Sequence, residues 1–192
     1  MRSEILRKLF ILTILVNFAP LLNAEDKRTI PLDMYLIIDG SSDLKNYKED
    51  AVSWINQQVV DRILIDGDRI TVWNAGNKAE LIYSETISDS SGKNELKDKL
   101  MALDTEGETA DFASALREVL PRLSQTPKDR LTYTMLITSS AKGMGDAFRG
   151  SSQSLFRWFR SEKYEHWQVL VVAPDIGEKV QQSAQAYMRS IR

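Results

Sequence analysis

Three oxygen-bearing side chains alternate directly after a strongly apolar segment of this sequence. Asp39, Ser41 and Asp43 follow the apolar residues 36–38. Carboxylate and hydroxyl oxygens are hard donors, and such donors suit Mg²⁺, Mn²⁺ or Ca²⁺. The same residue types also favour a polar turn that begins the next helix, because Ser and Asp accept hydrogen bonds from the first helical amides. The spacing therefore indicates either a cation site or a helix cap.

The composition limits the chemistry that the chain can perform. The 192 residues contain no cysteine, which excludes disulfides, thiolate metal sites and cysteine nucleophiles. The only histidine, His166, excludes any site that needs two imidazoles. A formal net charge of −2 does not favour a nucleic-acid partner. With 43% hydrophobic and 27% charged residues, the chain has the balance of one ordinary globular domain.

The N-terminus has the layout of a secretory signal peptide. Arg2, Arg7 and Lys8 precede an apolar run over residues 9–22, and small residues stand at 22–24. The run is shorter than the roughly 20 residues that span a bilayer, although an uncleaved anchor is the alternative. We predict that residues 1–24 are removed and that residues 25–192 form a single exported domain, periplasmic or secreted. It would have no membrane span, and so short and compact a chain is typical of bacteria.

Strands and helices alternate along the rest of the chain. The apolar patterns predict strands over residues 30–38, 69–75, 79–87, 131–138 and 168–173, and helices over residues 47–63, 94–103, 111–123, 154–162 and 177–191. This order predicts a doubly wound α/β fold with a mostly parallel central sheet, helices on both faces and one antiparallel hairpin strand. Ligands of such sheets bind beyond the carboxyl ends of the strands. The relevant loops are 39–43, 139–150 and 173–177, together with the segment before residue 111.

Several short motifs stand in the order found in one known family. The first strand is followed by Asp39-Gly40-Ser41-Ser42-Asp43, a Gly-Asp pair opens the segment 67–72, and Thr109 lies in the segment 107–111 before a helix. This pattern, together with the order of elements, resembles the von Willebrand factor type A (VWA) domains from about residue 32 to the C-terminus. The resemblance implies a metal-ion-dependent adhesion site at the carboxyl edge of the sheet.

The chain departs from the family's site at two positions. Asp43 replaces the last serine of the first motif, and Ser139 stands where the family has an aspartate after the fourth strand. The resemblance implies a divalent cation (Mg²⁺, Mn²⁺ or Ca²⁺) held by a variant set, namely Asp39, Ser41, Asp43, Thr109 and Ser139. The set keeps two carboxylates, so the charge has moved rather than vanished, and Asp146 is a possible substitute. The alternative is a scaffold that has lost its metal.

The resemblance implies a non-catalytic function. We expect an exported module that binds a protein partner, with an acidic partner residue completing the coordination of the cation. One alternative is metal-independent binding through other surfaces, such as the aromatic segment 154–162 with Trp158. Another is a metal-dependent hydrolase that uses Asp39 and Asp43. The sequence contains neither a Gly-x-Ser-x-Gly elbow nor a phosphate-binding Gly-x-x-x-x-Gly-Lys loop, and it offers no evident general base, so we predict no enzymatic activity.

Overall fold

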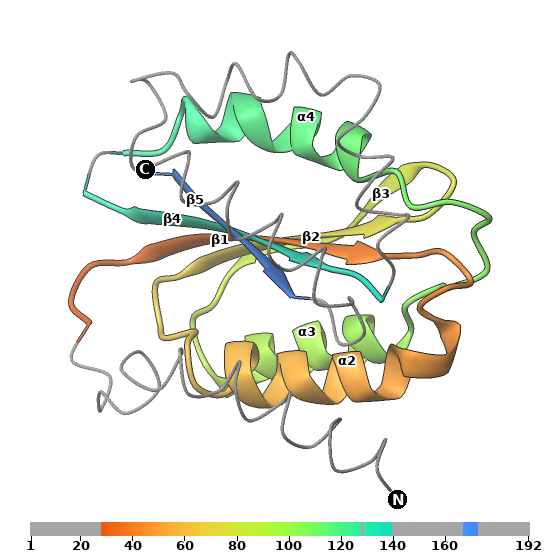
Figure 1. The fold of residues 1–192 in the computed structure, drawn as a ribbon. Coiled ribbons are helices and arrows are strands. Elements are labelled where there is room, and N and C mark those ends of the chain that lie inside the picture. Colours follow the sequence, from red (N-terminus) through yellow and green to blue (C-terminus); the bar gives the residue numbers. More distant parts are fainter. Residues whose placement is uncertain (1–27, 128, 140–166, 173–192) are drawn as a thin grey trace, which may run out of the picture.

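Five strands form one sheet through the middle of the molecule (Figure 1), in a computed structural model that describes residues 28–127, 129–139 and 167–172. The strands are β1 (Leu32–Asp39), β2 (Arg69–Ala75), β3 (Ala79–Thr86), β4 (Leu131–Ile137) and β5 (Trp167–Val172). Their order is β3-β2-β1-β4-β5. β2, β1, β4 and β5 are parallel, whereas β3 pairs antiparallel with β2. The prediction of a doubly wound, mostly parallel sheet with one antiparallel hairpin strand is confirmed.

Helices cover both faces of the sheet, as predicted. The helical segments are η1 (Lys45–Tyr47), α2 (Lys48–Trp54), η2 (Ile55–Val60), α3 (Ser90–Met101) and α4 (Phe112–Leu123). α2 and α3 lie on one face, and α4 lies on the other (Figure 1). The helices that connect to β2, on one side of β1, and to β4, on its other side, therefore cover opposite faces of the sheet. This arrangement makes the carboxyl end of β1 a topological switch point.

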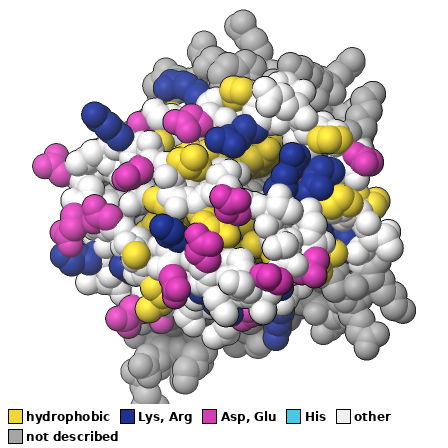
Figure 2. Space-filling view, turned by 180° about the vertical axis from the view of Figure 1, so that it is seen from behind, with side chains coloured by type: hydrophobic (Ala, Val, Ile, Leu, Met, Phe, Trp, Pro, Cys, Tyr) yellow, Lys and Arg dark blue, Asp and Glu magenta, His cyan; other side chains and the backbone are white. Residues whose placement is uncertain are grey.

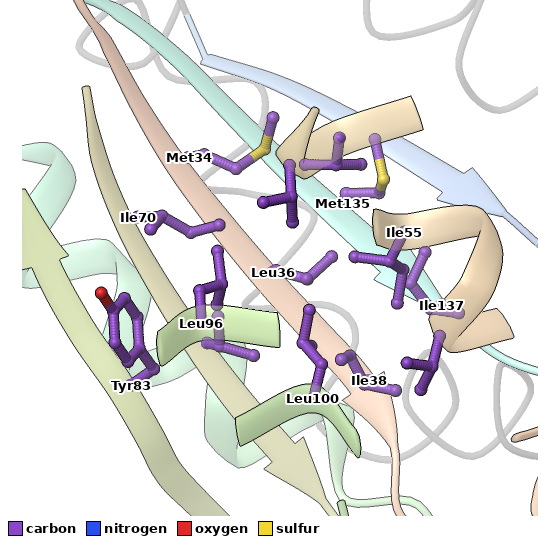
Figure 3. Packing of buried hydrophobic residues seen from close by; sticks show 14 of the residues in the cluster. Met34, Leu36, Ile38, Ile55, Ile70, Tyr83, Leu96, Leu100, Met135 and Ile137 are labelled. Atoms are coloured by element: carbon purple, nitrogen blue, oxygen red, sulfur yellow. The ribbon is translucent and has the colours of Figure 1, made fainter. Parts of the chain in front are cut away.

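β1 is the centre of two apolar cores. All eight of its residues are buried, as expected for a parallel strand covered on both faces. Met34, Leu36 and Ile38 belong to the core that includes residues of α2, η2 and α3 (Figure 3), whereas Tyr35 and Ile37 belong to the core formed with α4. The alternation follows from the two-residue period of a strand. Burial on both faces fixes the register of β1 and thus the position of its last residue.

The helix predicted over 47–63 is not a single regular helix. It begins as a short 3₁₀ segment, continues as α2, and widens into the π-helical segment η2. There the amides of Asp61 and Leu64 donate to carbonyls five residues back, Asn56 O at 2.9 Å and Val59 O at 3.0 Å. The extra residue in the wide turn is consistent with the burial of the neighbours Val59 and Val60 together.

The next predicted helix, 94–103, starts four residues too late. α3 begins at Ser90 because the Asp89 side chain caps it, accepting a hydrogen bond of 3.0 Å from the amide of Gly92. Residues 90–92 therefore belong to the first helical turn, ahead of the predicted start. The same kind of cap begins α4, where Asp111 accepts from the amide of Ser114 at 3.0 Å.

Other predictions fall wholly or mainly outside the described residues. These are the signal peptide at 1–24, Asp146, His166, and the helices at 154–162 (with Trp158) and 177–191. In the part of the chain that the structure does describe, no helix has the length and apolar character needed to cross a membrane.

Candidate functional site

The carboxyl ends of three strands meet at one edge of the sheet. The register of β1 against β2 places Asp39 beside Ala75, and the register against β4 places Ile38 beside Ile137. Thr138 and Ser139 therefore follow β4 at the level where β1 ends in Asp39. The topology thus brings the end of β1 and the end of β4 together, as the sequence predicts.

Asp39 is the centre of this edge. Its side chain is fully buried, and one carboxylate oxygen accepts hydrogen bonds from the amide of Ser41 at 2.8 Å and from Ser41 Oγ at 2.6 Å. The other oxygen accepts from Thr138 Oγ1 at 2.8 Å. All three donors are neutral, and no Lys or Arg of the described ranges forms an ion pair with Asp39. A buried carboxylate surrounded only by neutral donors favours the approach of a cation.

Two further polar atoms at this edge are buried without a hydrogen-bond partner among the described residues. They are Ser139 Oγ and Asn74 Oδ1. Asn74 lies near the end of β2, and its amide group donates to the carbonyl of Asp104 at 2.9 Å. Buried polar atoms are normally hydrogen-bonded, so an unpaired atom calls for a ligand, a water or a functional reason. These two oxygen atoms mark a place beside Asp39 where a ligand or a water would find polar atoms to contact.

Three glycines join the loops of this edge backbone to backbone. Gly40 N donates to Ala75 O at 3.0 Å, and Gly107 N donates to Gly40 O at 3.0 Å. A Cβ on Gly40 would lie 2.0 Å from Asn74 Oδ1, and one on Gly107 would lie 2.9 Å from Gly40 O and 3.1 Å from the Cα of Gly76. Positions 40 and 107 therefore require glycine for this approach. The contacts fix the loop after β1 against the segment that carries Thr109.

The two remaining residues of the predicted set lie at the surface. Asp43 and Thr109 are exposed. The amide of Thr109 donates to Asn77 Oδ1 at 3.3 Å, and among the described residues its side chain forms no hydrogen bond with Asp39. Asp111, rather than Thr109, caps the following helix. The structure thus brings Asp39 and Ser41 into direct contact, buries Ser139 beside Thr138, and leaves Asp43 and Thr109 on the solvent side.

A surface ion pair connects the same two loops from outside. Lys45 Nζ donates to Glu106 Oε1 at 2.7 Å, and this hydrogen bond and the Glu106 charge raise the pKa of Lys45. Both side chains are exposed, so solvent screens the attraction. The glycine contacts, and not this pair, hold the loops together.

The donor atoms fit a hard divalent cation by their chemistry. Asp39 and Asp43 supply carboxylates, and Ser41, Thr109 and Ser139 supply hydroxyls, with no nitrogen or sulfur donor in the set. The observation that favours a ligand here is Ser139 Oγ, which has no hydrogen-bond partner among the described residues. Within the described ranges no three acidic or imidazole side chains gather in a metal-binding cluster. A cation would therefore depend on hydroxyls and on water as well as on Asp39.

Sequence reasoning missed three residues of this edge. Thr138 holds Asp39, Asn74 packs against Gly40, and Asn77 Oδ1 accepts from the amides of Glu108 and Thr109. The signal for Thr138 was its position at the end of the predicted strand, next to Ser139. Asn74 and Asn77 carried no signal beyond the hairpin turn, because their roles depend on contacts with a loop about 30 residues away.

No family model matches the sequence. An uncharacterized protein of Treponema pallidum (strain Nichols) is 24% identical over 178 residues, which cover 86% of this chain and 78% of that protein.

Several solved structures are similar to this chain in fold. A von Willebrand factor type A protein from Catenulispora acidiphila matches with 12% identity and a TM-score of 0.56, over 84% of this chain and 42% of that one. The manganese-loaded TRAP protein of Plasmodium vivax matches with 17% identity and a TM-score of 0.62, over 84% of this chain and 63% of that one. Proximal thread matrix protein 1 of the mussel byssus matches with 14% identity and a TM-score of 0.56, over 80% of this chain and 41% of that one.

These likenesses identify the class of fold. The chain has a VWA-like α/β fold, and it spans between 41% and 63% of the length of these three structures. At identities of 12–17% the likeness concerns the fold alone.

Proposed function

We propose that this chain is a protein-binding module that engages an acidic side chain of its partner through a divalent cation at the carboxyl edge of the sheet. Asp39, Ser41, Asp43, Thr109 and Ser139 are the proposed ligands, directly or through water. The observation that carries the proposal is Asp39 itself, a fully buried carboxylate whose hydrogen-bond donors in the described part of the chain are all neutral. A bound cation would supply the missing positive charge and an open position for a carboxylate oxygen.

The rest of the edge supports this proposal in two ways. Ser139 Oγ, buried and without a hydrogen-bond partner among the described residues, offers a further oxygen ligand, and the glycine contacts hold the Thr109 segment next to the Asp39 loop. A protein of the same fold, TRAP, has been solved loaded with manganese. Mn²⁺ is therefore the first ion to test, followed by Mg²⁺ and Ca²⁺.

Thermal unfolding of the protein in EDTA, and then with excess Mn²⁺, Mg²⁺ or Ca²⁺, tests the cation site. An ion at 100 times its dissociation constant stabilises the folded state by about 2.7 kcal/mol. For a domain of this size that raises Tm by about 5–10 °C. Asp39→Asn should lose the shift. Asp66→Asn, which changes an exposed aspartate just before the amino end of β2, should keep it. Absence of any shift in the wild-type protein would contradict the proposal.

A second candidate function is partner binding without metal. The observation that favours it is the set of hydrogen bonds from Ser41 and Thr138, which already occupies both oxygens of Asp39. On this proposal the loops are a rigid frame, and EDTA leaves partner binding unchanged. A partner identified by affinity capture should then bind equally well in EDTA and in Mn²⁺, whereas the cation proposal requires loss of binding in EDTA.

We also propose that the module acts outside the cytoplasm, after removal of residues 1–24. The basic start and the apolar run of the N-terminus support this location. Mass spectrometry of the protein recovered from expressing cells should give a chain that begins at Glu25. Recovery of the intact chain in the membrane fraction would instead indicate an uncleaved anchor.

A further inference from the structure

A polar cavity of about 250 Å³ lies at the opposite edge of the sheet from Asp39. It is formed by the amino ends of β1 and β2, the carboxyl end of β3 and the last turn of α4; its lining includes Asp33, Tyr35, Arg69, Thr71, Ser84 and Arg122. Lys and Arg side chains gather in the upper right of the view in Figure 2, the side on which these ends lie. No sequence motif pointed to this cavity.

The carboxylate of Asp33 in the cavity wall is already fully engaged. Asp33 is 2% exposed and forms a two-pronged ion pair with Arg69. Arg130 Nε donates to the same carboxylate at 2.5 Å, and Thr126 Oγ1 donates at 3.1 Å. Burial alone raises the pKa of Asp33, but the two arginines outweigh burial and hold this pKa below its ordinary value. The charge of Asp33 is thus already balanced by Arg69 in the lining and by Arg130 behind it, so Asp33 leaves the other cation of the cavity unpaired.

Arg122 adds a second guanidinium to the cavity. Its guanidinium carbon lies 5.4 Å from the centre of the Trp73 ring, and Trp73 Nε1 is fixed by a hydrogen bond of 2.8 Å to Glu118. Arg122 forms no ion pair with any carboxylate of the described residues. Stacking on an aromatic ring orients a guanidinium without using its N–H donors. Arg122 is therefore a positioned cation that still has donors to offer.

Neutral donors complete the lining. Tyr35 is 5% exposed, and burial raises the pKa of its phenol above the ordinary value of 10.0. Thr71 and Ser84 contribute hydroxyls 3.2 Å apart. Glu85 also borders the cavity, but it is exposed, so solvent and salt screen its charge. A small group with several acceptor oxygens and a negative charge matches this set of donors.

We infer that this cavity binds a small oxyanion, a carboxylate or phosphate group, between Arg122 and Arg69. Arginine suits such groups because its planar N–H donors match two oxygens at once. The cavity volume suits a group of this kind or the end of a side chain rather than a whole nucleotide cofactor. The inference is independent of the proposed cation site, because none of the residues lining the cavity belongs to the Asp39 edge.

Calorimetric titration of the full chain, freed of metal on a chelating resin, tests the inference with inorganic phosphate in one arm and acetate in the other. The resin removes any cation at Asp39 without adding a soluble carboxylate, so failure here and failure of the proposed function are distinguishable. We expect saturable binding of at least one anion, and a Tm increase of about 3 °C at ten times its dissociation constant. The stronger of the two arms identifies the class of anion.

Matched variants decide whether the anion lies in this cavity. Arg122→Gln should weaken binding at least tenfold, whereas Lys97→Gln, which removes a cation paired with Asp61, should leave it unchanged. If Arg122→Gln proves unstable, the second variant is Ser84→Val on β3, the outermost strand of the sheet. It should also weaken binding of the anion. Two results would overturn the inference: no saturable binding of either anion, or equal affinity in the wild type and both cavity variants.

Discussion

Two buried aspartates at the two ends of β1 differ in what balances their charge. Asp33 is paired with Arg69 and Arg130, whereas Asp39 accepts hydrogen bonds only from neutral groups. Arginines fix the charge of Asp33 within the protein, so this end of the strand needs no further cation. The protein supplies no such partner for Asp39 in the described part of the chain. This contrast explains why the cation is proposed at one end of β1 and an anion at the other.

The substitution Asp33→Asn tests whether arginines balance the charge of Asp33, because the ion pair makes stability depend on pH. The pKa of Asp33 is lower in the folded protein than its ordinary value of 3.8, so the unfolded chain binds the proton more strongly. The contribution of Asp33 to the free energy of unfolding is fully present above pH 5 and is lost as the pH falls toward the folded-state pKa. Urea unfolding from pH 7 to pH 3 should therefore show a smaller acid-induced loss of stability in Asp33→Asn than in the wild type.

The same variant should be less stable at pH 7. We expect a loss of about 2–3 kcal/mol, because Arg130 is left without its carboxylate. The figure is below that for a fully buried pair, because the Arg69 side chain is 45% exposed. Asp61→Asn is the matched control: it breaks a surface pair with Lys97 and should cost less than 1 kcal/mol without changing the pH profile. An unchanged acid profile in Asp33→Asn would contradict this account of the ion pair.

At the scale of elements, the glycine contacts decide how precisely the carboxyl-edge loops are placed. Gly107→Ala would bring a Cβ within 2.9 Å of Gly40 O, which is backbone and cannot rotate away. We expect a loss of about 1–3 kcal/mol in unfolding free energy, as for other overpacked sites. If the edge holds a cation, affinity for Mn²⁺ should fall as well, because the Thr109 segment is displaced.

Gly92→Ala is the control for this prediction. A Cβ there would lie 3.9 Å from its nearest neighbour, Ile87 Cδ1, and Gly92 is in the first turn of α3. Alanine favours helix over glycine by up to about 1 kcal/mol, so this variant should be as stable as the wild type or more stable. Equal losses of unfolding free energy in the two variants, measured by urea unfolding, would show that the close contact of Gly107 with Gly40 O does not cause the destabilisation.

The elements themselves could be predicted where their signal is local. The strand β1, the hairpin of β2 and β3, and the helix α4 all follow from apolar patterns within short segments. The wide turn of η2 depends on packing, and the early start of α3 depends on the Asp89 cap. The apolar periodicity predicts neither feature. The site divides in the same way. Asp39 and Ser41 were predicted at the sheet edge, but the contact between Asp33 and Arg130 joins residues 97 apart, and no local pattern announces it.

For the molecule as a whole, the sheet separates the two proposed sites. Asp33 and Asp39 stand six residues apart on the same buried strand, which corresponds to about 20 Å. The amino end of β1 carries arginines, whereas its carboxyl end carries a carboxylate that has no charged partner among residues 28–127, 129–139 and 167–172. Such a molecule can hold an anion at one end and a cation at the other without the two ligands touching. The rigid, doubly covered strand between them offers no evident second arrangement through which they would couple.

We therefore predict that the stabilisation by the two ligands is additive. Sites more than 7–10 Å apart with no shared partners usually act independently, within about 0.5 kcal/mol. Thermal unfolding with Mg²⁺ alone, phosphate alone and both together should give a combined free-energy gain equal to the sum of the separate gains. Asp39→Asn should remove only the Mg²⁺ term, and Arg122→Gln only the phosphate term. A combined gain that differs from the sum by more than 1 kcal/mol would show that β1 transmits binding from one edge to the other. The module would then be a two-state device in which occupation of the anion cavity sets its affinity for the cation.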